Sequence, residues 1–411
     1  MNIWILQTGE PLHIDDTNLR PMRAVNLSNK LVEAGHNVVL FSSAFSHQEK
    51  KHRSKKYKIY KISKSLEIRL IPSCGYKKHI GLKRLFDHFQ LAWNLRKLLK
   101  EEKNIPDIAF IGYPPIETAF IMSAWLKVKE IPCVLDVKDL WPSMFVNAFP
   151  KIIRPLAKVI FYPYFYLAKK TINNVSGISA MAPAFLDWVL NFAKRKPNDN
   201  NMVFRLTSPI DEVSKLELSS AKKWWYRQGV DEKMHKFCFI GTFSTAFDFE
   251  QIYYTAKKLN NCQFILCGDG PCLDSTKLMM QDLNNVIFTG WIDRVKIKSL
   301  AKVSIASLAP YKNIDNFIFN TPNKIIDSLS LGLPILTPLE GEVANLIRKY
   351  KVGFNYKNAY ELENSINALI CDKKIQKNIS NNAKKLYQNE FEFNKVYDDF
   401  VKYLEKMSNE R

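Results

Sequence analysis

Short apolar runs alternate with longer amphipathic segments along the whole chain, a pattern typical of parallel sheets with helices on both faces. In the first half, the apolar runs predict strands at Ile3–Leu6, Asn37–Phe41, Ile108–Gly112, Cys133–Val137, Val175–Ser179 and Met202–Leu206. In the second half, they predict strands at Phe237–Gly241, Gln263–Cys267, Val286–Thr289, Val303–Leu308, Pro334–Thr337 and Gly353–Tyr356. The repeated plan predicts an α/β fold with two Rossmann-like domains, whose parallel sheets face each other across a cleft.

The domain boundary is predicted in the polar, strand-poor stretch between the two halves. A chain of 411 residues suits two domains of about 200 residues each. We expect an N-terminal domain at 1–206, a linker at 207–236 and a C-terminal domain at 237–390. The last helix, within 391–411, is expected to pack back on the N-terminal domain.

Ligands of open parallel sheets bind beyond the carboxyl ends of the strands, so loops at those ends are the candidate sites. The loop Thr8–Arg20 follows the first strand and leads into a helix that starts near Pro21. The N–H groups of that helix and the charge of Arg20 favour an anion. The alternative is a solvated loop in which Asp16 or Asn18 caps the helix.

A second candidate loop, Leu135–Pro142, ends the strand Cys133–Val137. Burial of Trp141 and Pro142 would expose Asp136, Lys138 and Asp139 in a rigid polar loop, so Lys138 and Asp139 are candidate catalytic residues. The alternative is that Asp139 caps the next segment and Trp141 only packs.

Two candidate loops lie in the second half. Gly241 ends a strand and is followed by Thr242, as in a phosphate-contacting turn, although any strand-to-helix turn has this form. In Asn320–Leu336, Pro322 or Asn323 begins a helix whose N–H groups suit a diphosphate. Lys324 is unfavourable at the positive end of a helix dipole unless an anion binds there. Asp327, one turn later, suits the hydroxyls of a ribose. The alternative is a plain helix with a surface lysine and aspartate.

The net charge of +20 favours an anionic membrane surface or a phosphorylated substrate. No nucleic-acid-binding motif is present, so no nucleic-acid partner is expected. The lysine-rich run Lys50–Lys64 predicts a solvated, mobile loop. Together with the aromatic segment Phe161–Tyr166, it predicts weak association with anionic lipid.

Cysteine usage and hydropathy indicate the compartment. Seven cysteines, several of them in apolar runs, disfavour a disulfide framework and favour a reducing compartment. Their spacing fits no zinc motif, so no metal is expected. No signal peptide is evident, and the apolar stretch Val159–Ala168 is about half the ~20 residues that a transmembrane helix needs. We expect a cytoplasmic protein, soluble or peripheral at the inner face of the cell membrane.

Taken together, these loops resemble those of the retaining family 4 glycosyltransferases of GT-B fold, in the branch typified by fucosamine-type transferases of bacterial surface-polysaccharide assembly. The resemblance covers nearly the whole chain. It is carried by LRP (Leu19–Pro21), AGH (Ala34–His36), KDLWP (Lys138–Pro142), FIG (Phe239–Gly241), LCGDGP (Leu266–Pro271), VIFTGWI (Val286–Ile292), PNKIID (Pro322–Asp327) and GLPIL (Gly332–Leu336).

The resemblance implies a nucleotide-sugar donor, for which a UDP-sugar is expected, and a glycan or lipid-linked acceptor. It implies no cofactor and no metal. It implies that Thr289, Gly290, Trp291 and Ile292 hold the nucleobase and that Asp327 binds the ribose. Gly241, Thr242, Pro322, Asn323 and Lys324 would contact the diphosphate, with Lys324 also catalytic. Thr17–Arg20 and Lys138–Asp139 would line the sugar and acceptor side.

The sequence departs from the family pattern at three places. The first acid of the E-x7-E motif falls on Phe319, Thr242 replaces the arginine of the GR…K pair with no lysine before Lys257, and the usual histidine falls near Lys138. Two alternatives have other expectations. A nicotinamide-dependent oxidoreductase or epimerase needs a glycine fingerprint that is missing here, and a non-catalytic basic membrane-binding protein does not need PNKIID.

Overall fold

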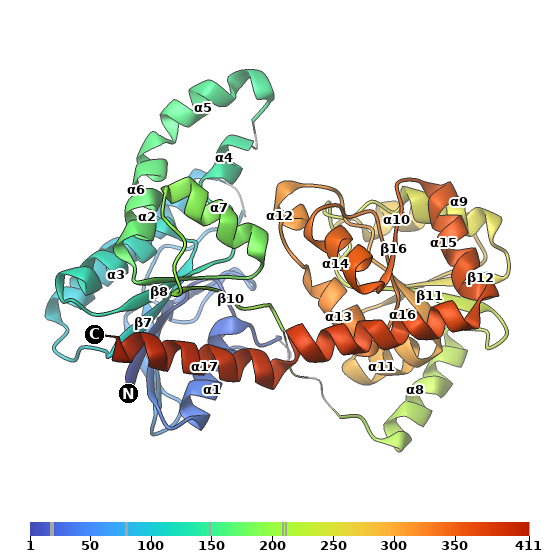
Figure 1. Ribbon diagram of the computed structural model, residues 1–411, viewed down its shortest axis with the longest axis horizontal. Coiled ribbons are helices and arrows are strands. Elements are labelled where there is room, and N and C mark those ends of the chain that lie inside the picture. The colour runs from blue at the N-terminus through green and yellow to red at the C-terminus, as the bar shows by residue number, and fades with distance from the viewer. Residues whose placement is uncertain (17–19, 79–80, 148, 208, 210–211, 411) are drawn as a thin grey trace. The chain divides into compact units, whose positions relative to one another are not determined.

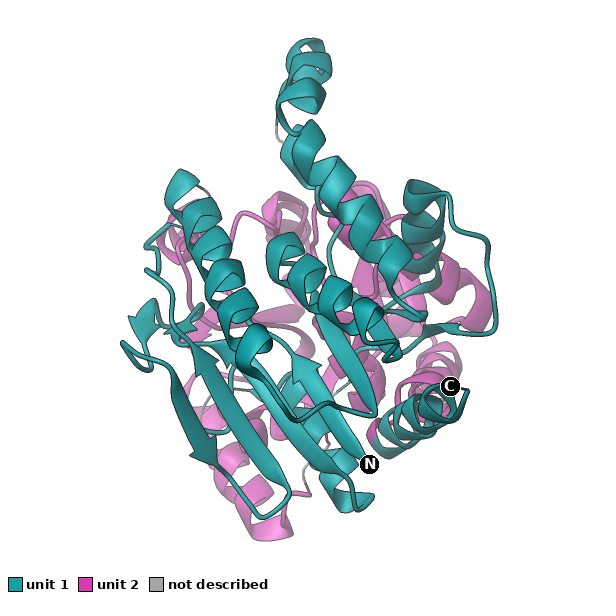
Figure 2. Ribbon diagram, turned by 90° about the vertical axis from the view of Figure 1, so that its left-hand side faces the viewer, with its two compact units in different colours: residues 1–208, 394–411 teal, residues 209–393 magenta. Residues whose placement is uncertain are grey.

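The protein, seen as a computed structural model, is described at residues 1–16, 20–78, 81–147, 149–207, 209 and 212–410. It forms two compact units (Figure 2). Unit 1 comprises Met1–Ser208 and Asn394–Arg411, and unit 2 comprises Pro209–Phe393. Each unit is built on its own sheet, parallel throughout in unit 2 and parallel except for the edge strand in unit 1, as the two-domain α/β prediction requires.

The sheet of unit 1 has the strand order β10-β9-β8-β7-β1-β2-β6-β5 among the described residues. Its strands are β1 (Asn2–Leu6), β2 (Asn37–Ser43), β5 (Lys58–Lys61), β6 (Leu66–Ile71), β7 (Ile108–Tyr113), β8 (Cys133–Val137), β9 (Gly177–Ala180) and β10 (Asn201–Val203). A separate hairpin pairs β3 (Phe45–Ser46) with β4 (Lys51–His52). The chain runs outward from β1 to β6 and then crosses to β7 on the other side of β1. The point between β1 and β7 is therefore the topological switch point, where ligands of such sheets bind.

Helices cover both faces of this sheet. They are α1 (Arg23–Glu33), α2 (Leu82–Glu101), α3 (Ile116–Val128), α4 (Ser143–Asn147), α5 (Arg154–Ile160), α6 (Tyr162–Asn174), α7 (Pro183–Ala193) and α17 (Phe393–Asn409), with a 3₁₀ turn η1 (Lys151–Ile153) before α5. Helices α2, α3, α6 and α7 lie on one face, and α1 and α17 lie on the other (Figure 1).

The C-terminal helix α17 completes the core of unit 1. Phe400 is fully buried and stacks on Phe204 with the ring centroids 3.9 Å apart, while the ring of Phe110 lies 5.3 Å away. The Tyr403 hydroxyl donates a hydrogen bond to the Asn200 carbonyl oxygen at 2.7 Å. The end of the chain therefore belongs to the first unit.

The sheet of unit 2 has the order β13-β12-β11-β14-β15-β16, with every neighbouring pair parallel. Its strands are β11 (His235–Ile240), β12 (Cys262–Cys267), β13 (Val286–Gly290), β14 (Ser304–Leu308), β15 (Ile335–Thr337) and β16 (Gly353–Asn355). Its helices are α8 (Lys215–Arg227), α9 (Glu250–Lys258), α10 (Leu273–Met279), α11 (Arg294–Val303), α12 (Asp315–Ile318), α13 (Asn323–Leu331), α14 (Glu342–Tyr350), α15 (Ala359–Cys371) and α16 (Lys373–Leu386), followed by a π-helical turn η2 (Tyr387–Phe391). Here the switch point lies between β11 and β14.

The segment predicted as a linker, 207–236, is instead largely part of unit 2. It contains α8, which begins with a capping box between Ser214 and Glu217. Trp225 is buried against Leu300, and its indole N–H donates to the Lys296 carbonyl oxygen at 3.2 Å. The linker prediction is wrong because a large aromatic side chain anchors this polar helix to the core.

The lysine-rich run Lys50–Lys64 also differs from the prediction of a mobile loop. It contains β4 and β5, and β5 pairs antiparallel with β6 at the edge of the sheet. The lysines of β5 are exposed, as expected of an edge strand.

The remaining predictions concern the cysteines and membrane spans. Each of the seven cysteines is a thiol outside any disulfide. None of the helices in the described ranges is long and apolar enough to cross a membrane.

We expect Phe400→Ala to lower the free energy of unfolding of unit 1 by about 3–5 kcal/mol, because it opens a cavity in a closed aromatic stack. Denaturant unfolding with calorimetry of the two transitions would measure this change. Tyr226→Ala, at a side chain that is 76 % exposed, is the control and should shift stability by less than about 0.5 kcal/mol. Equal effects of the two substitutions would contradict the assignment of α17 to the core.

Candidate functional site

The Gly241 turn at the end of β11 is held by the loop that follows β12. The Gly241 N–H donates to the Cys267 carbonyl oxygen, and the Phe243 N–H donates to the Asp269 carbonyl oxygen, both at 2.8 Å. A Cβ on Gly268 would lie only 1.9 Å from the Gly241 carbonyl oxygen. The two loops therefore touch through their backbones, which leaves no room for a side chain at this contact.

Lys324 brings its ammonium group to the same turn. A Cβ on Gly241 would lie 1.3 Å from Lys324 Nζ, and this ammonium donates to the Ile240 carbonyl oxygen. Its Nζ also lies 4.7 Å from the ring centroid of Phe239 and 5.1 Å from that of Phe247. Aromatic faces attract a cation, so these rings hold the charge at the carboxyl end of β11. The structure thus brings together two residues that were selected separately from the sequence.

Helix α13 presents its N-terminus beside this cation. Pro322 is the N-cap residue, and no described side chain caps the helix. Asn323 is exposed, and Asp327 follows Lys324 by one helical turn. Burial raises the pKa of the Tyr311 hydroxyl, and the nearby Asp327 carboxylate raises it further. A helix N-terminus, a cation and a carboxylate one turn later can together bind a phosphate group and a hydroxyl-bearing group.

The predicted nucleobase residues Thr289–Ile292 continue the same edge of the sheet. The Gly268 N–H donates to the Gly290 carbonyl oxygen at 2.7 Å, which links the β13 end to the Gly241 turn. Trp291 is 63 % exposed, whereas Ile292 packs against the apolar cluster around Trp225. Backbone and the Trp291 ring are therefore the groups available to a ligand there, and Ile292 contributes to packing. Thr242 is exposed beside the turn.

In unit 1, the N-terminus of α1 is occupied by a carboxylate of the chain itself. Glu10 Oε2 accepts a hydrogen bond from the Ala24 N–H at 2.8 Å, and its Oε1 pairs with the Lys138 ammonium. Glu10 is buried. Glu10 therefore already takes the Ala24 N–H, one of the groups that were predicted to bind an external anion. Sequence reasoning missed Glu10 because its partners are distant along the chain.

A buried charge network lies next to Glu10. Asp136 Oδ1 accepts a hydrogen bond from Arg23 Nη1 at 2.8 Å and another from the Ser179 hydroxyl, and Lys138 Nζ lies 3.4 Å from Asp136 Oδ2. Asp136 is fully buried, contrary to the prediction of an exposed side chain, whereas Trp141 is buried as predicted. Lys138 therefore bridges two carboxylates and holds the loop after β8 to the loop after β1.

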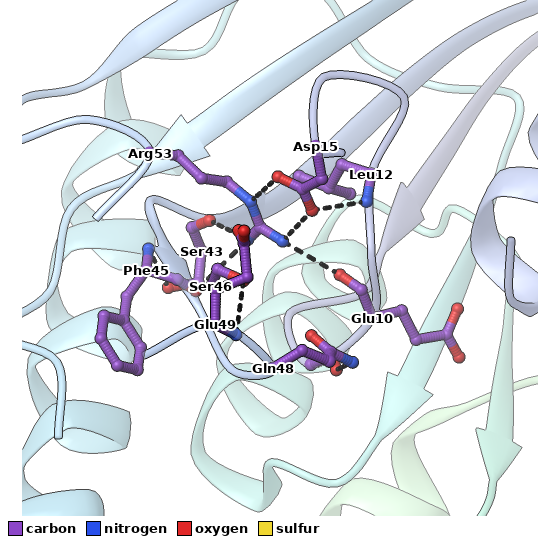
Figure 3. Close-up of polar contacts among 10 residues, drawn as sticks. Glu10, Leu12, Asp15, Ser43, Phe45, Ser46, Gln48, Glu49 and Arg53 are labelled. Carbon is purple, nitrogen blue, oxygen red and sulfur yellow. Dashed lines mark hydrogen bonds and ion pairs between the residues drawn. The ribbon is translucent and has the colours of Figure 1, made fainter. Parts of the chain in front are cut away.

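A second ion pair fixes the opening loop (Figure 3). Arg53 Nε donates to Asp15 Oδ1 at 2.7 Å, and Arg53 Nη1 donates to the Ser43 carbonyl oxygen at 3.0 Å. The Leu12 N–H donates to Asp15 Oδ2 at 2.9 Å. The two charged side chains are almost completely buried, so Asp15 and Arg53 have a structural role. The lysine-rich surroundings of Arg53 gave no signal of this pairing.

Four other residues of unit 1 were predicted on the sugar and acceptor side. Thr17 and Asn18 lie outside the described residues. Arg20 is exposed, and Asp139 is half-buried in the turn after β8. The structure joins Lys138 to Glu10 and Asp136, and the acceptor role of this set stays a prediction.

One pocket of about 690 Å³ lies at the β16 edge of unit 2, between α14 and α16. Its walls are mainly apolar and include Ile347, Tyr356 and Ile379. It contains no residue of the predicted donor site. In the described ranges, no group of three or more His, Cys, Asp or Glu side chains is arranged to hold a metal ion.

Comparisons with known proteins agree with this architecture. Residues 222–386 match the profile of the family described as glycosyl transferases group 1. No curated protein sequence matches the chain. Among solved structures, sucrose-phosphate synthase from Thermosynechococcus elongatus is similar with a TM-score of 0.72, at 13 % identity and with 100 % of each chain covered.

Two further solved structures extend the likeness. HepE from Anabaena, in complex with UDP, has a TM-score of 0.65 at 14 % identity, covering 98 % of this chain and 99 % of that chain. WaaG, a glycosyltransferase involved in lipopolysaccharide biosynthesis, has a TM-score of 0.64 at 12 % identity with the same coverage. The chain therefore has the two-domain GT-B fold, and the match of residues 222–386 to glycosyl transferases group 1 supports glycosyltransferase activity.

Proposed function

We propose that the chain transfers a sugar from a UDP-sugar to a hydroxyl group of a glycan or lipid-linked acceptor during assembly of a bacterial surface polysaccharide. The transferred group would be a hexosyl or N-acetylhexosaminyl residue. The observation that carries the proposal is the Lys324 ammonium beside the Gly241 turn and the α13 N-terminus. HepE, solved with UDP and with UDP-glucose, and WaaG in lipopolysaccharide biosynthesis support the donor and the pathway.

The proposed roles follow the arrangement in unit 2. The diphosphate contacts Gly241, Thr242 and the start of α13 from Pro322 to Lys324. The ribose binds Asp327, and the nucleobase binds at Thr289–Ile292. On the sugar and acceptor side, the proposed residues of unit 1 are Thr17, Asn18, Arg20, Lys138 and Asp139.

The proposed reaction retains the configuration of the donor sugar. The bond between the anomeric carbon and the diphosphate oxygen breaks, and the acceptor oxygen forms its bond on the same face. The acceptor proton passes to the departing phosphate oxygen, so the products are the glycoside and UDP. Fixed positive potential that steadies the departing diphosphate would supply most of the catalysis, here from Lys324 and the N–H groups of α13.

The first prediction here concerns the donor. At a concentration about a hundredfold above its Kd, UDP should stabilise the protein by about 2.7 kcal/mol, because it binds only the folded state. A thermal-shift panel of UDP, GDP, ADP, CMP and NAD would measure this as a raised Tm. Stabilisation by NAD, with no response to any nucleoside diphosphate, would favour an oxidoreductase and overturn the proposal.

The second prediction concerns the diphosphate and ribose contacts. Asp327→Asn weakens charge-assisted hydrogen bonds and should lower kcat/KM at least roughly tenfold. Lys324→Ala removes the proposed diphosphate cation and should lower it about 10²–10³-fold. Asp274→Asn and Lys302→Ala change exposed residues of α10 and α11 and serve as matched controls. Wild-type kinetics and UDP affinity in both site variants would show that the donor binds elsewhere.

The third prediction concerns stereochemistry. Proton NMR of the product should show the anomeric configuration of the donor, and activity should survive EDTA because Lys324 and α13 take the place of a divalent metal. An inverted product together with complete loss of activity in Asp139→Asn would make Asp139 the general base and exclude retention.

A further inference from the structure

Helix α2 carries an apolar stripe on the side that faces away from the sheet. Leu82, Phe86, Phe89 and Trp93 are between 50 % and 84 % exposed. Their spacing of four, three and four residues places them on one face of the helix. The opposite face, with Leu91, Leu95 and Leu99, is buried. Packing within unit 1 therefore does not account for this stripe, which is an exposed apolar surface.

A second exposed apolar segment runs through η1, α5 and the start of α6. In α5 only Ala157 is buried, and this helix extends away from the sheet of unit 1 in both views (Figures 1 and 2). The exposed side chains, each between 63 % and 91 % exposed, are Ile152, Leu156, Val159, Ile160 and Tyr162. Soluble proteins seldom leave such a continuous set of large apolar side chains uncovered.

The two segments lie on the same side of unit 1. Helix α3 packs between α2 and α6, and all three cover the same face of the sheet (Figure 1). On α3, Phe120 and Ile121 are half-buried and Val128 is exposed. The outward sides of α2, α3, η1, α5 and α6 are called the apolar helix surface below.

The segment of this surface that contains η1, α5 and α6 carries only basic charges. Between Asp139 and Asp187 the sequence has no Asp or Glu. The same interval contains the basic residues Lys151, Arg154, Lys158, Lys169 and Lys170, and α2 adds exposed Arg96, Lys97 and Lys100 beside its stripe. Large apolar side chains mixed with basic ones are complementary to an anionic bilayer. The apolar side chains enter its acyl region, and the basic side chains pair with its phosphates.

We propose that the apolar helix surface docks on an anionic lipid bilayer, with α5 entering the interface. A second copy of the chain is a poorer occupant, because a two-fold contact would bring two basic surfaces together. The surface lies wholly in unit 1, whereas the proposed donor residues lie in unit 2. Docking therefore stands apart from the proposed reaction. It shares the aromatic segment Phe161–Tyr166 with the membrane contact predicted from the sequence, but it uses α2 and α5 in place of Lys50–Lys64.

Vesicle sedimentation of the full chain tests the docking. We expect binding to phosphatidylcholine vesicles with about 30 % phosphatidylglycerol, weaker binding to pure phosphatidylcholine, and a loss on going from about 0.05 M to about 0.5 M NaCl. The double variant Leu156→Glu/Val159→Glu should lower the partition coefficient at least about tenfold, because it places carboxylates in the interface. The matched control Leu216→Glu/Leu278→Glu alters equally exposed leucines of unit 2 and should bind like the wild type.

Each outcome decides the proposal. Equal binding of the two double variants, or no binding by the wild type at low salt, would overturn it. A wild-type dimer that only Leu156→Glu/Val159→Glu converts to a monomer would assign the surface to a second copy instead. The UDP thermal shift, measured on the same variants, reports on the donor site, so loss of docking with an intact shift separates the two proposals.

Discussion

The Lys324 ammonium occupies the space in which a side chain at position 241 would begin. A Cβ there would lie 1.3 Å away, and Gly241 has a φ of 147°, which L side chains rarely adopt. Gly268 meets the same turn backbone to backbone. The ends of β11 and β12 and the start of α13 are therefore packed around one cation. That cation lies at the positive end of a helix dipole, which is electrostatically unfavourable. The rings of Phe239 and Phe247 offset part of this repulsion. A bound anion would offset it directly.

In unit 1, carboxylates of the chain itself compensate the positive charges and the helix N–H group at the carboxyl ends of the strands. Glu10 satisfies the Ala24 N–H and pairs with Lys138, and Asp136 pairs with Arg23 beneath the carboxyl ends of the strands. Removing one member of a buried pair leaves an uncompensated charge, which typically costs about 3–5 kcal/mol. These residues therefore fix the loops after β1 and β8 relative to each other, and any acceptor contact made by Lys138 depends on that frame.

The sequence predicted the elements with strong apolar periodicity and missed those that depend on distant partners. The strand Cys133–Val137 was predicted to the residue, because it is an apolar run with clear ends. Strand β6 was not predicted, because it directly follows the lysine-rich run Lys50–Lys64, which was interpreted as a loop. Helix α8 was taken for a linker, although Ser214 and Glu217 form a readable capping box. Gly241 and Lys324 were each selected from local motifs, but their contact, like that of Glu10 with Lys138, arises only from strand order.

The two helix N-termini present different side chains to an anion. A phosphate brought to α13 meets an ammonium group, whereas one brought to α1 meets the carboxylate of Glu10. Two opposite unit charges at 4 Å attract by about 4 kcal/mol at an effective dielectric constant of 20. At α13 this attraction adds to that of the helix N-terminus, whereas at α1 the Glu10 carboxylate is already paired with Lys138 and adds no attraction. Both units have the same kind of sheet and a switch point, so the fold alone does not distinguish them. Because the similar structures share only 12–14 % of residues with this chain, the distinction rests on its own side chains, and these favour unit 2 as the side that holds the diphosphate.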